Sequence, residues 1–488
     1  MNPFELISPQ LAILIGAGLI LVFDAIFPKD NRYLPWMALA AIAVSVSFAI
    51  SLAVRGEYHV GFEGTYSVDK FSIFFSVVFA GIGAAVVFAS MNWVDRVGRR
   101  KSEYYALLLT ATAGLMFLAG ARDLITIFIA LELSSIPQYI LAGWGKDERS
   151  GESGLKYLLL GSIASALLLF GMALLYGLSG STFLPEIATF IGENASDNRS
   201  LLILASTLII AGFGFKMALV PFQMWVPDVY EGAPTPVAAF LSVGSKAAAF
   251  AVVLRIFFEG LNAEILSNDW AMIFAVLAAI SMTVGNIFAL VQSNIKRMLG
   301  YSSVAQAGNF AIGLAAIAVV GQEFTLAASA VLFFVVAYAF TNLAVFIAVI
   351  AISRQLESDD INAYEGLAKS APLLALSLGI ALISLTGIPP SAGFWAKLYI
   401  FNAAAQADLA WLVIVAVLNS VLAAFYYLRI VRLMFRNAED QIGSAPFSIP
   451  KSIGFVLGIT VLGVLVFGFF PTPIISVARE AAAIFSIG

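Results

Sequence analysis

The sequence contains no cysteine and only one histidine, and charged residues make up only 11% of its 488 positions. Iron–sulfur clusters need cysteine thiolates, and haem in a membrane needs histidine pairs, so neither cofactor fits this chain. Zinc sites also need combinations of ligands that the chain lacks. His59 lies in a polar stretch with no second ligand nearby, so we expect a solvated loop residue. No metal or electron-transfer site is therefore expected here.

Charge is scarce because hydrophobic residues supply 61% of the sequence, and the mean hydropathy is +0.96. A soluble domain has about 25% charged residues. The composition therefore predicts an integral membrane protein. The net charge of −4 says little about partners, since the distribution of charge over the loops matters more, and nucleic acid is not expected as a partner.

Apolar runs of about 17 to 25 residues, the length that crosses a bilayer, follow one another through the sequence. They predict an all-α polytopic membrane protein, a single transmembrane domain over residues 1–488. We expect fourteen spans, near residues 9–27, 34–54, 71–91, 104–121, 122–143, 155–177, 201–226, 234–258, 270–292, 298–320, 324–352, 371–404, 409–435 and 452–470.

The basic residues predict how the chain is oriented. An even number of spans places both termini on one side of the membrane. Loops after odd-numbered spans hold sixteen of the 26 lysines and arginines, whereas the opposite loops hold five: Arg55, Lys70, Arg122, Arg199 and Arg479. Basic loops stay in the cytoplasm, so both termini should lie outside it.

Part of the sequence repeats itself. The segment Ser134-Ser135-Ile136-Pro137-Gln138 recurs 168 residues later as Ser302-Ser303-Val304-Ala305-Gln306, and the same offset carries Pro221 onto Pro389. Because a unit of five spans is odd, its second copy enters the membrane from the opposite side. Chance similarity between apolar sequences is the alternative.

This repeat divides the spans into four groups. The second and third groups are two inverted repeats. In order, we expect helices 1–3 within residues 1–100, helices 4–8 within 104–258, helices 9–13 within 270–435, and helix 14 with the C-terminus within 452–488.

Four ionisable residues lie within otherwise apolar spans: Glu132, Lys216, Lys246 and Lys397. A charge near the bilayer centre costs at least about 2.5 to 3.5 kcal/mol, so such residues usually face partners or water and serve ion movement. Burial disfavours the charged form of a lysine, whereas a carboxylate about 4 Å away favours it by about 4 kcal/mol at an effective dielectric constant near 20. A Glu–Lys pair of variable separation would therefore bind and release a proton. A fixed structural ion pair is the alternative.

Prolines lie close to two of these lysines. Pro221 follows Lys216, and Pro389 and Pro390 precede Lys397. Proline removes a backbone donor and clashes one turn earlier, so we expect discontinuous helices 7 and 12, with freed backbone groups that hold water. Kinks with only a packing role are the alternative.

Charged residues at span ends are less informative. Lys156 opens the sixth span and Arg255 closes the eighth, which favours interfacial anchoring for both. Lys156 is also a second-tier relay candidate, because it lies toward the cytoplasmic end. Asp228 and Glu231 lie near span ends, where we expect them to be hydrated.

The stretch from Trp225 to Phe240, which contains Pro-Asp-Val-Tyr-Glu-Gly-Ala-Pro-Thr, closely resembles the signature of the antiporter-like membrane subunits of respiratory complex I. The sequence of this motif resembles the N type rather than the M or L types, and the resemblance covers essentially the whole chain. It implies a proton-translocating subunit of NADH–quinone oxidoreductase. The chain itself would perform no redox chemistry.

By this resemblance, the proton relay consists of Glu132, Lys216, Lys246 and Lys397, with Lys156 as a possible addition. The implied route runs from the cytoplasm through the Lys216 region, across Lys246, to an exit at Lys397. Two positions depart from the family pattern: Gln223 replaces an expected histidine, and Ser245 an expected proline.

The resemblance also implies partners. FMN, iron–sulfur clusters and quinone would be bound by other subunits, with no cofactor in this chain. The neighbours would be M-type, L-type and small membrane subunits, together with lipid, water and protons, in a bacterial inner membrane with both termini periplasmic. A subunit of a cation/proton antiporter or of a membrane-bound hydrogenase-type complex is the alternative.

Overall fold

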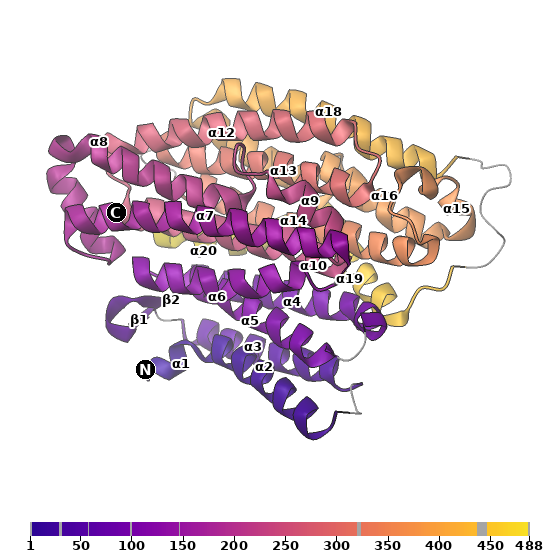
Figure 1. Ribbon diagram of the computed structural model, residues 1–488. Coiled ribbons are helices and arrows are strands. Elements are labelled where there is room, and N and C mark those ends of the chain that lie inside the picture. The colour runs from indigo at the N-terminus through magenta and orange to yellow at the C-terminus, as the bar shows by residue number, and fades with distance from the viewer. Residues whose placement is uncertain are drawn as a thin grey trace.

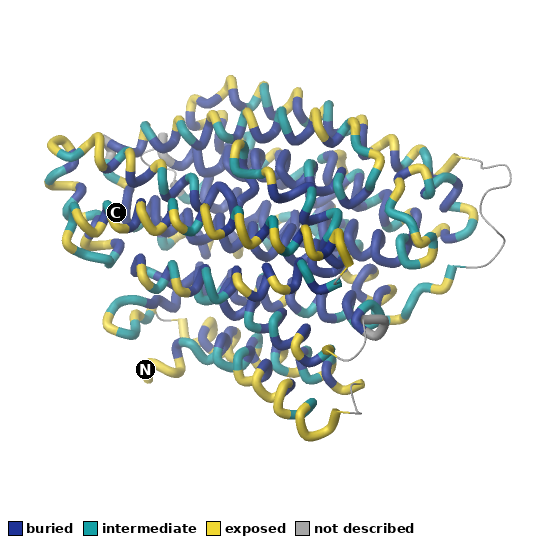
Figure 2. The backbone as a smooth tube through the Cα atoms, viewed as in Figure 1, coloured by how far each residue is buried: buried dark blue, intermediate teal, exposed yellow. Residues whose placement is uncertain are grey.

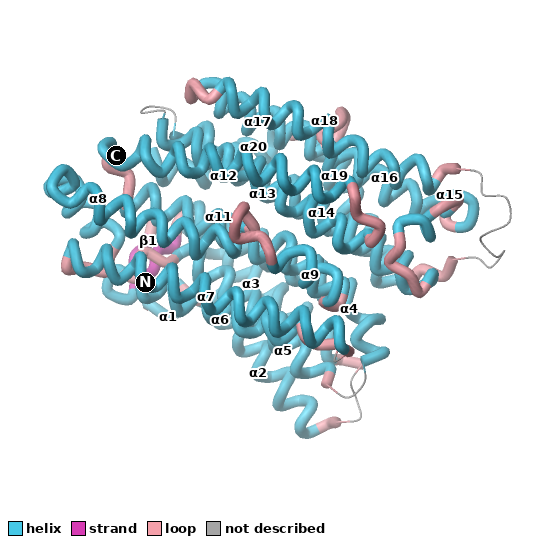
Figure 3. Tube along the Cα trace, turned by 45° about the horizontal axis from the view of Figure 1, so that its top comes forward, coloured by secondary structure: helices cyan, strands magenta, loops and turns pink. Residues whose placement is uncertain are grey.

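The computed structural model describes residues 2–28, 32–56, 58–97, 100–145, 147–319, 324–436 and 447–486. Its helices run side by side, with α2 and α3 at one edge and α12 and α18 at the opposite edge (Figure 1). Both ends of the chain lie at the same end of the bundle (Figures 1 and 3). Twelve helices in the described residues are long and apolar enough to cross a membrane. The predicted all-α polytopic membrane fold is confirmed.

Among the described residues, the first part of the chain forms the α-helices α1 to α11 and one small sheet. The strands β1 (His59–Gly61) and β2 (Tyr66–Val68) pair antiparallel. The helices are α1 (Pro3–Leu6), α2 (Ser8–Ile26), α3 (Leu34–Arg55), α4 (Lys70–Val97), α5 (Lys101–Gly120), α6 (Leu124–Ala142), α7 (Glu148–Ser179), α8 (Leu184–Met217), α9 (Trp225–Gly232), α10 (Thr235–Phe240) and α11 (Lys246–Arg255).

The second part is also helical, and each predicted span overlaps one helix or a helix in two pieces. A C-terminal helix, α20, follows the last predicted span. The helices are α12 (Glu264–Leu290), α13 (Ile295–Val319), α14 (Phe324–Leu356), α15 (Leu367–Ser370), α16 (Pro372–Thr386), α17 (Ala392–Gln406), α18 (Ala410–Met434), α19 (Lys451–Phe469) and α20 (Thr472–Ala482).

One predicted boundary is wrong by several turns. The seventh span was expected to begin at residue 201, but α8 begins at Leu184. The polar segment between Glu193 and Arg199 lowers the local hydropathy without breaking the helix, because it contains no proline or glycine. Hydropathy measures the length of the membrane segment, and this helix extends beyond it.

The seventh and twelfth spans are interrupted, as predicted. The first stops at Met217 and resumes at Trp225, and the second stops at Thr386 and resumes at Ala392. Each stop leaves helix carbonyls without helical partners in the middle of the apolar region.

The two interruptions share backbone details. Ala218 and Gly387 cap the helices in the left-handed conformation, with φ of 66° and 89°. The peptide bonds before Pro221 and Pro390 are both cis. The left-handed residues recur at a spacing of 169 residues. At this spacing Pro221 corresponds to Pro390, whereas the offset of 168 in the sequence pairs it with Pro389.

The eighth span is the most enclosed part of the fold. It contains two π-helical segments, Leu241–Ser245 and Ile256–Gly260, on either side of α11. Its most apolar window is fully buried inside the protein, and Figure 2 shows the surrounding buried core and the exposed outer helices. A π-turn places one extra residue in the helix and is frequent at functional sites. Here it directly precedes Lys246.

Candidate functional site

Lys246 lies at the centre of the candidate site and is only 2% exposed. Its ammonium donates hydrogen bonds to the hydroxyl and carbonyl oxygens of Ser303 on α13. The Ser303 hydroxyl also lies 3.2 Å from the Tyr230 hydroxyl and 3.4 Å from the Tyr338 hydroxyl. Among the described residues, no carboxylate forms an ion pair with Lys246. Its charge is therefore held by neutral oxygens and an aromatic ring, whose centre is 5.4 Å away.

Lys216 occupies the last turn of α8, immediately before the first interruption, and is 4% exposed. Its Nζ donates a hydrogen bond to the Tyr157 hydroxyl at 3.3 Å and lies 5.2 Å from the ring centres of both Tyr139 and Tyr157. The negative end of the helix dipole also favours a cation here. These neutral groups stabilise an ammonium that the apolar core alone would not tolerate.

Glu132 lies on α6 and accepts a 2.7 Å hydrogen bond from the Ser165 hydroxyl on α7. No ion pair within 4 Å joins Glu132 to Lys216 in the described structure, although its carboxylate acts electrostatically on that lysine. The Glu132–Lys216 pair is therefore open here, with each member held by a neutral partner.

Lys397 lies on α17, after the second interruption, and is 6% exposed. Its Nζ donates hydrogen bonds to the carbonyl of Thr386 at 2.9 Å and to the hydroxyl of Ser420 at 3.3 Å. Thr386 is the last residue of α16, so its carbonyl is one that the interruption frees. The helix break thus provides a ligand for the lysine, and no carboxylate pairs with Lys397 in the part of the chain that the structure describes.

A small space lies between Tyr338 and Lys397. Its volume is about 10 Å³, and its lining includes Tyr338, Gln306, Thr341, Ser384 and Lys397. This is about the space that one water molecule needs, and the polar lining offers the two to four partners that a buried water requires. Because Tyr338 also contacts the Ser303 hydroxyl, polar groups run from the central lysine to Lys397.

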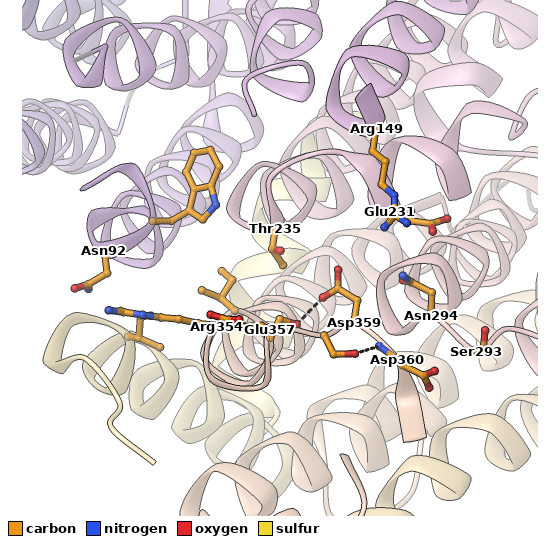
Figure 4. Close-up of a pocket in the computed structure, with 15 residues that line it drawn as sticks. Asn92, Arg149, Glu231, Thr235, Ser293, Asn294, Arg354, Glu357, Asp359 and Asp360 are labelled. Carbon is orange, nitrogen blue, oxygen red and sulfur yellow. Dashed lines mark hydrogen bonds between the residues drawn. The ribbon is translucent and has the colours of Figure 1, made fainter. Parts of the chain in front are cut away.

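A larger polar cavity of about 740 Å³ opens at the opposite end of the bundle from the termini. Figure 4 shows Arg149 and Glu231 on one side of it and Arg354, Glu357 and Asp359 on another. Glu231 directly follows Tyr230, whose hydroxyl lies beside Ser303. The helix α9 thus carries residues of both the cavity and the central hydrogen-bond cluster.

An ion-pair network lies beside this cavity. Asp228 pairs with Lys156 at 2.7 Å and with Arg297 at 2.6 Å, and Arg297 also pairs with Glu231 at 3.0 Å. Burial raises the pKa of the Asp228 carboxyl, but the hydrogen bonds from Lys156 and Arg297 outweigh burial and hold that pKa below its usual value. Asp228 and Glu231, expected to be simply hydrated, are thus partly buried members of a network.

Arg255 is not the interfacial anchor that the sequence predicts. Its side chain is 0% exposed and pairs with Asp69 at 2.7 Å and with Glu259 at 2.6 Å. Arg122 pairs with Glu259 at 2.8 Å, and Ser67 donates a hydrogen bond to Asp69. The cluster joins the starts and ends of helices far apart in sequence, which no local pattern reveals.

The sequence does not single out the neutral partners of the lysines. Ser303 belongs to the repeated motif, which indicates a repeat and not a hydrogen-bond partner. Tyr157 and Tyr338 look like ordinary aromatic residues of apolar helices. Ser245, in place of the expected proline, ends the π-segment before Lys246 and is 4% exposed. Gln223 lies in the interruption of the seventh span, between α8 and α9, where its backbone carbonyl accepts a hydrogen bond from the Val226 backbone.

Comparison with known proteins places these features in a family. Residues 121–423 match the family model described as NADH:quinone oxidoreductase/Mrp antiporter, TM. Subunit N of the NADH-quinone oxidoreductase of Dehalococcoides mccartyi is 43% identical over 484 residues, covering 98% of this chain and 99% of that protein.

Solved structures are also similar. A chain of respiratory complex I from Thermus thermophilus, with bound aureothin, has a TM-score of 0.79 and 32% identity, covering 96% of this chain and 98% of that one. A chain of the Mrp complex from Dietzia sp. DQ12-45-1b has a TM-score of 0.85 and 21% identity, covering 100% of this chain and 98% of that one. The latter similarity concerns the fold alone.

Proposed function

The chain belongs to the NADH:quinone oxidoreductase/Mrp antiporter transmembrane family, and on that basis we propose that it is a proton-translocating membrane subunit of NADH–quinone oxidoreductase. One observation carries the role of its buried charges. Lys246 is buried at the centre of the fold and is bound only by neutral groups, so no counter-ion fixes its charge. A lysine in this setting exchanges its proton at low cost, as a relay requires.

The proposed route has three stages. Protons are taken up at the polar end cavity and in the Lys216 region, where Glu132 modulates the charge of Lys216. They pass to Lys246 through the hydroxyl cluster of Ser303. They leave by way of Lys397, across the water-sized space beside Tyr338. Lys156 takes part at the uptake end, because its partner Asp228 belongs to the ion-pair network beside the polar cavity.

The orientation follows from the basic loops. The cavity end of the bundle carries Arg149, Arg354, Lys296 and Arg297, whereas the termini lie at the other end. The positive-inside rule therefore supports uptake from the cytoplasm and both termini on the periplasmic side of a bacterial inner membrane.

The internal repeat is also part of the proposal. The matched interruptions, with their left-handed helix caps 169 residues apart, support inverted repeats over residues 104–258 and 270–435. The two copies carry their buried lysines at different positions. Lys397 follows its interruption, whereas Lys216 precedes the first one. Such asymmetry gives the relay a direction.

The redox chemistry belongs to partners in this proposal. FMN, iron–sulfur clusters and quinone bind to other subunits, and M-type, L-type and small membrane subunits adjoin this chain. Purifying the tagged chain under mild conditions tests this. Flavin and iron–sulfur proteins should copurify, whereas a nickel–iron protein would indicate a hydrogenase-type complex, and exclusively hydrophobic subunits would indicate an antiporter.

Glu132→Gln should shift the pH profile of proton-coupled turnover. In this proposal the Glu132 carboxylate is the charge that modulates Lys216, and the variant removes that charge. The measurement is NADH-driven proton uptake by inverted vesicles at a series of pH values. Glu193→Gln, which removes an exposed carboxylate from α8, is the control. A profile that coincides with that of the control would mean that Glu132 is only structural.

Gly387→Ala should reduce proton pumping severalfold, because it disturbs Lys397. A Cβ at this position would lie 2.8 Å from Lys397 Cδ, and the φ of 89° is unfavourable for alanine. Ala218→Gly, the reverse change at the matching helix end, removes a left-handed alanine and should be tolerated. Pumping is compared at equal amounts of assembled complex. Equal rates in the two variants would contradict the proposed contact between the second interruption and the relay.

A further inference from the structure

A second large cavity lies away from the lysines. It is an apolar groove of about 920 Å³, formed by the end of α3, one face of α4, one face of α14, and the helices α19 and α20. Its walls are aliphatic and aromatic, as at Ile73, Phe74, Val77, Phe340 and Ile459. We call it the α4–α14 groove. Nothing in the proposed proton route uses it.

The groove is polar at one end only. Tyr58, Asp69, Lys70 and Glu480 gather where α4 begins and α20 ends, and the Lys70 ammonium lies 3.0 Å from the Glu480 carboxylate. Both side chains of this pair are more than half exposed, so a charged ligand can reach them. At the far end, Phe88 and Val456 keep the lining apolar. The groove is therefore amphipathic along its length.

The groove is about as long as the hydrocarbon core is thick, because α4 rises about 27 Å from Lys70 to Phe88 at 1.5 Å per residue. The part nearest the polar end, from Lys70 to Gly81, rises about 17 Å. This is close to the depth that the acyl chains of one leaflet fill. Gly81 borders the groove, and a Cβ built on it would meet no atom within 4 Å. The wall is thus open at the depth where acyl chains end.

From this geometry we propose that the α4–α14 groove binds a phospholipid from the leaflet on the Lys70 side. The acyl chains lie along α4 and α14, and the phosphate binds the Lys70 ammonium in competition with Glu480. A transmembrane helix of a partner would have two polar ends, whereas this groove has one. The polar end, followed by the apolar part of the groove, matches the headgroup and acyl chains of a lipid in their order.

The lipid contacts a helix that also serves the relay. Val336, Ala339 and Phe340 face the groove, while Tyr338 and Thr341 on the other side of α14 line the space next to Lys397. Acyl chains packed in the groove therefore support the helix that positions Tyr338. This consequence rests on the proposed function, but lipid binding itself does not.

The test uses the purified complex, a phospholipid with a photoreactive acyl chain, and mass mapping of the labelled peptides. The intact protein should be labelled on α4 near Gly81 and on the facing part of α14. Gly81→Leu fills the groove from its open wall and should remove most of this label. Gly18→Leu is the matched control, because Gly18 is exposed on α2 and a Cβ there also meets nothing within 4 Å.

Lys70→Gln provides a second, independent variant at an exposed position, and it should reduce labelling by an anionic lipid severalfold. Labelling of the groove that is unchanged in both Gly81→Leu and Lys70→Gln would overturn the proposal. So would a partner subunit cross-linked to a photoreactive residue at Val77 in the intact complex. Because labelling is measured without turnover, a failure of the proton proposal leaves this result interpretable.

Discussion

Replacing Arg255 with leucine should destabilise the folded chain by about 3 to 5 kcal/mol, the cost of removing one partner from a buried ion pair. The guanidinium is fully enclosed and holds Asp69 and Glu259 together, so its loss leaves the buried Asp69 carboxylate without a counter-ion, whereas Glu259 keeps Arg122. Thermal unfolding in detergent and the yield of assembled complex on native gels should both fall sharply.

A double variant separates the charge from the packing. Asp69→Asn removes the negative charge of Asp69 but keeps an oxygen that accepts from the Ser72 backbone, and its amide nitrogen can donate to the Ser67 hydroxyl. Arg255→Leu combined with Asp69→Asn should therefore be more stable than Arg255→Leu alone. Strictly additive losses would show that Arg255 acts by packing and not as an ion-pair partner.

Replacing Lys246 with methionine should slow proton transfer through this subunit about a hundredfold, within the range that a positioned acid–base group contributes. Methionine has a similar length and no titratable group, so the packing around Ser303 is retained while the proton carrier is lost. The complex should still assemble, in contrast to the Arg255 variant. The readout is NADH-driven acidification of inverted vesicles, normalised to the amount of complex.

The control for this variant is Lys451→Met, which removes an exposed lysine at the start of α19. It should pump at the normal rate. If the two methionine variants pump equally well, Lys246 carries no protons.

The membrane fold and the positions of the lysines could be predicted from the sequence because both depend on local contrast. A charge in an apolar run is conspicuous wherever the run occurs, and Pro221 and Pro390 interrupt helices through chemistry confined to one turn. The same contrast identified Lys216, Lys246 and Lys397, all of which are buried in the structure.

The partners of these charges could not be predicted, because they come from distant parts of the chain. Ser303 is 57 residues from Lys246, and Asp69 is 186 residues from Arg255. Arg255 shows this most clearly. A residue at a span end usually contacts headgroups, and only the packing of α4 and α5 around Arg255 excludes water from it. The separation of Glu132 from Lys216 is likewise a matter of tertiary distance.

The central claim is that protons cross through Lys246, and the number of protons translocated per NADH oxidised tests it most directly. The measurement compares the reconstituted normal complex with the Lys246→Met complex at a matched rate of NADH oxidation, set by limiting NADH. The account predicts fewer protons per NADH in the variant, since its redox partners still work while this subunit does not. An unchanged ratio would contradict it.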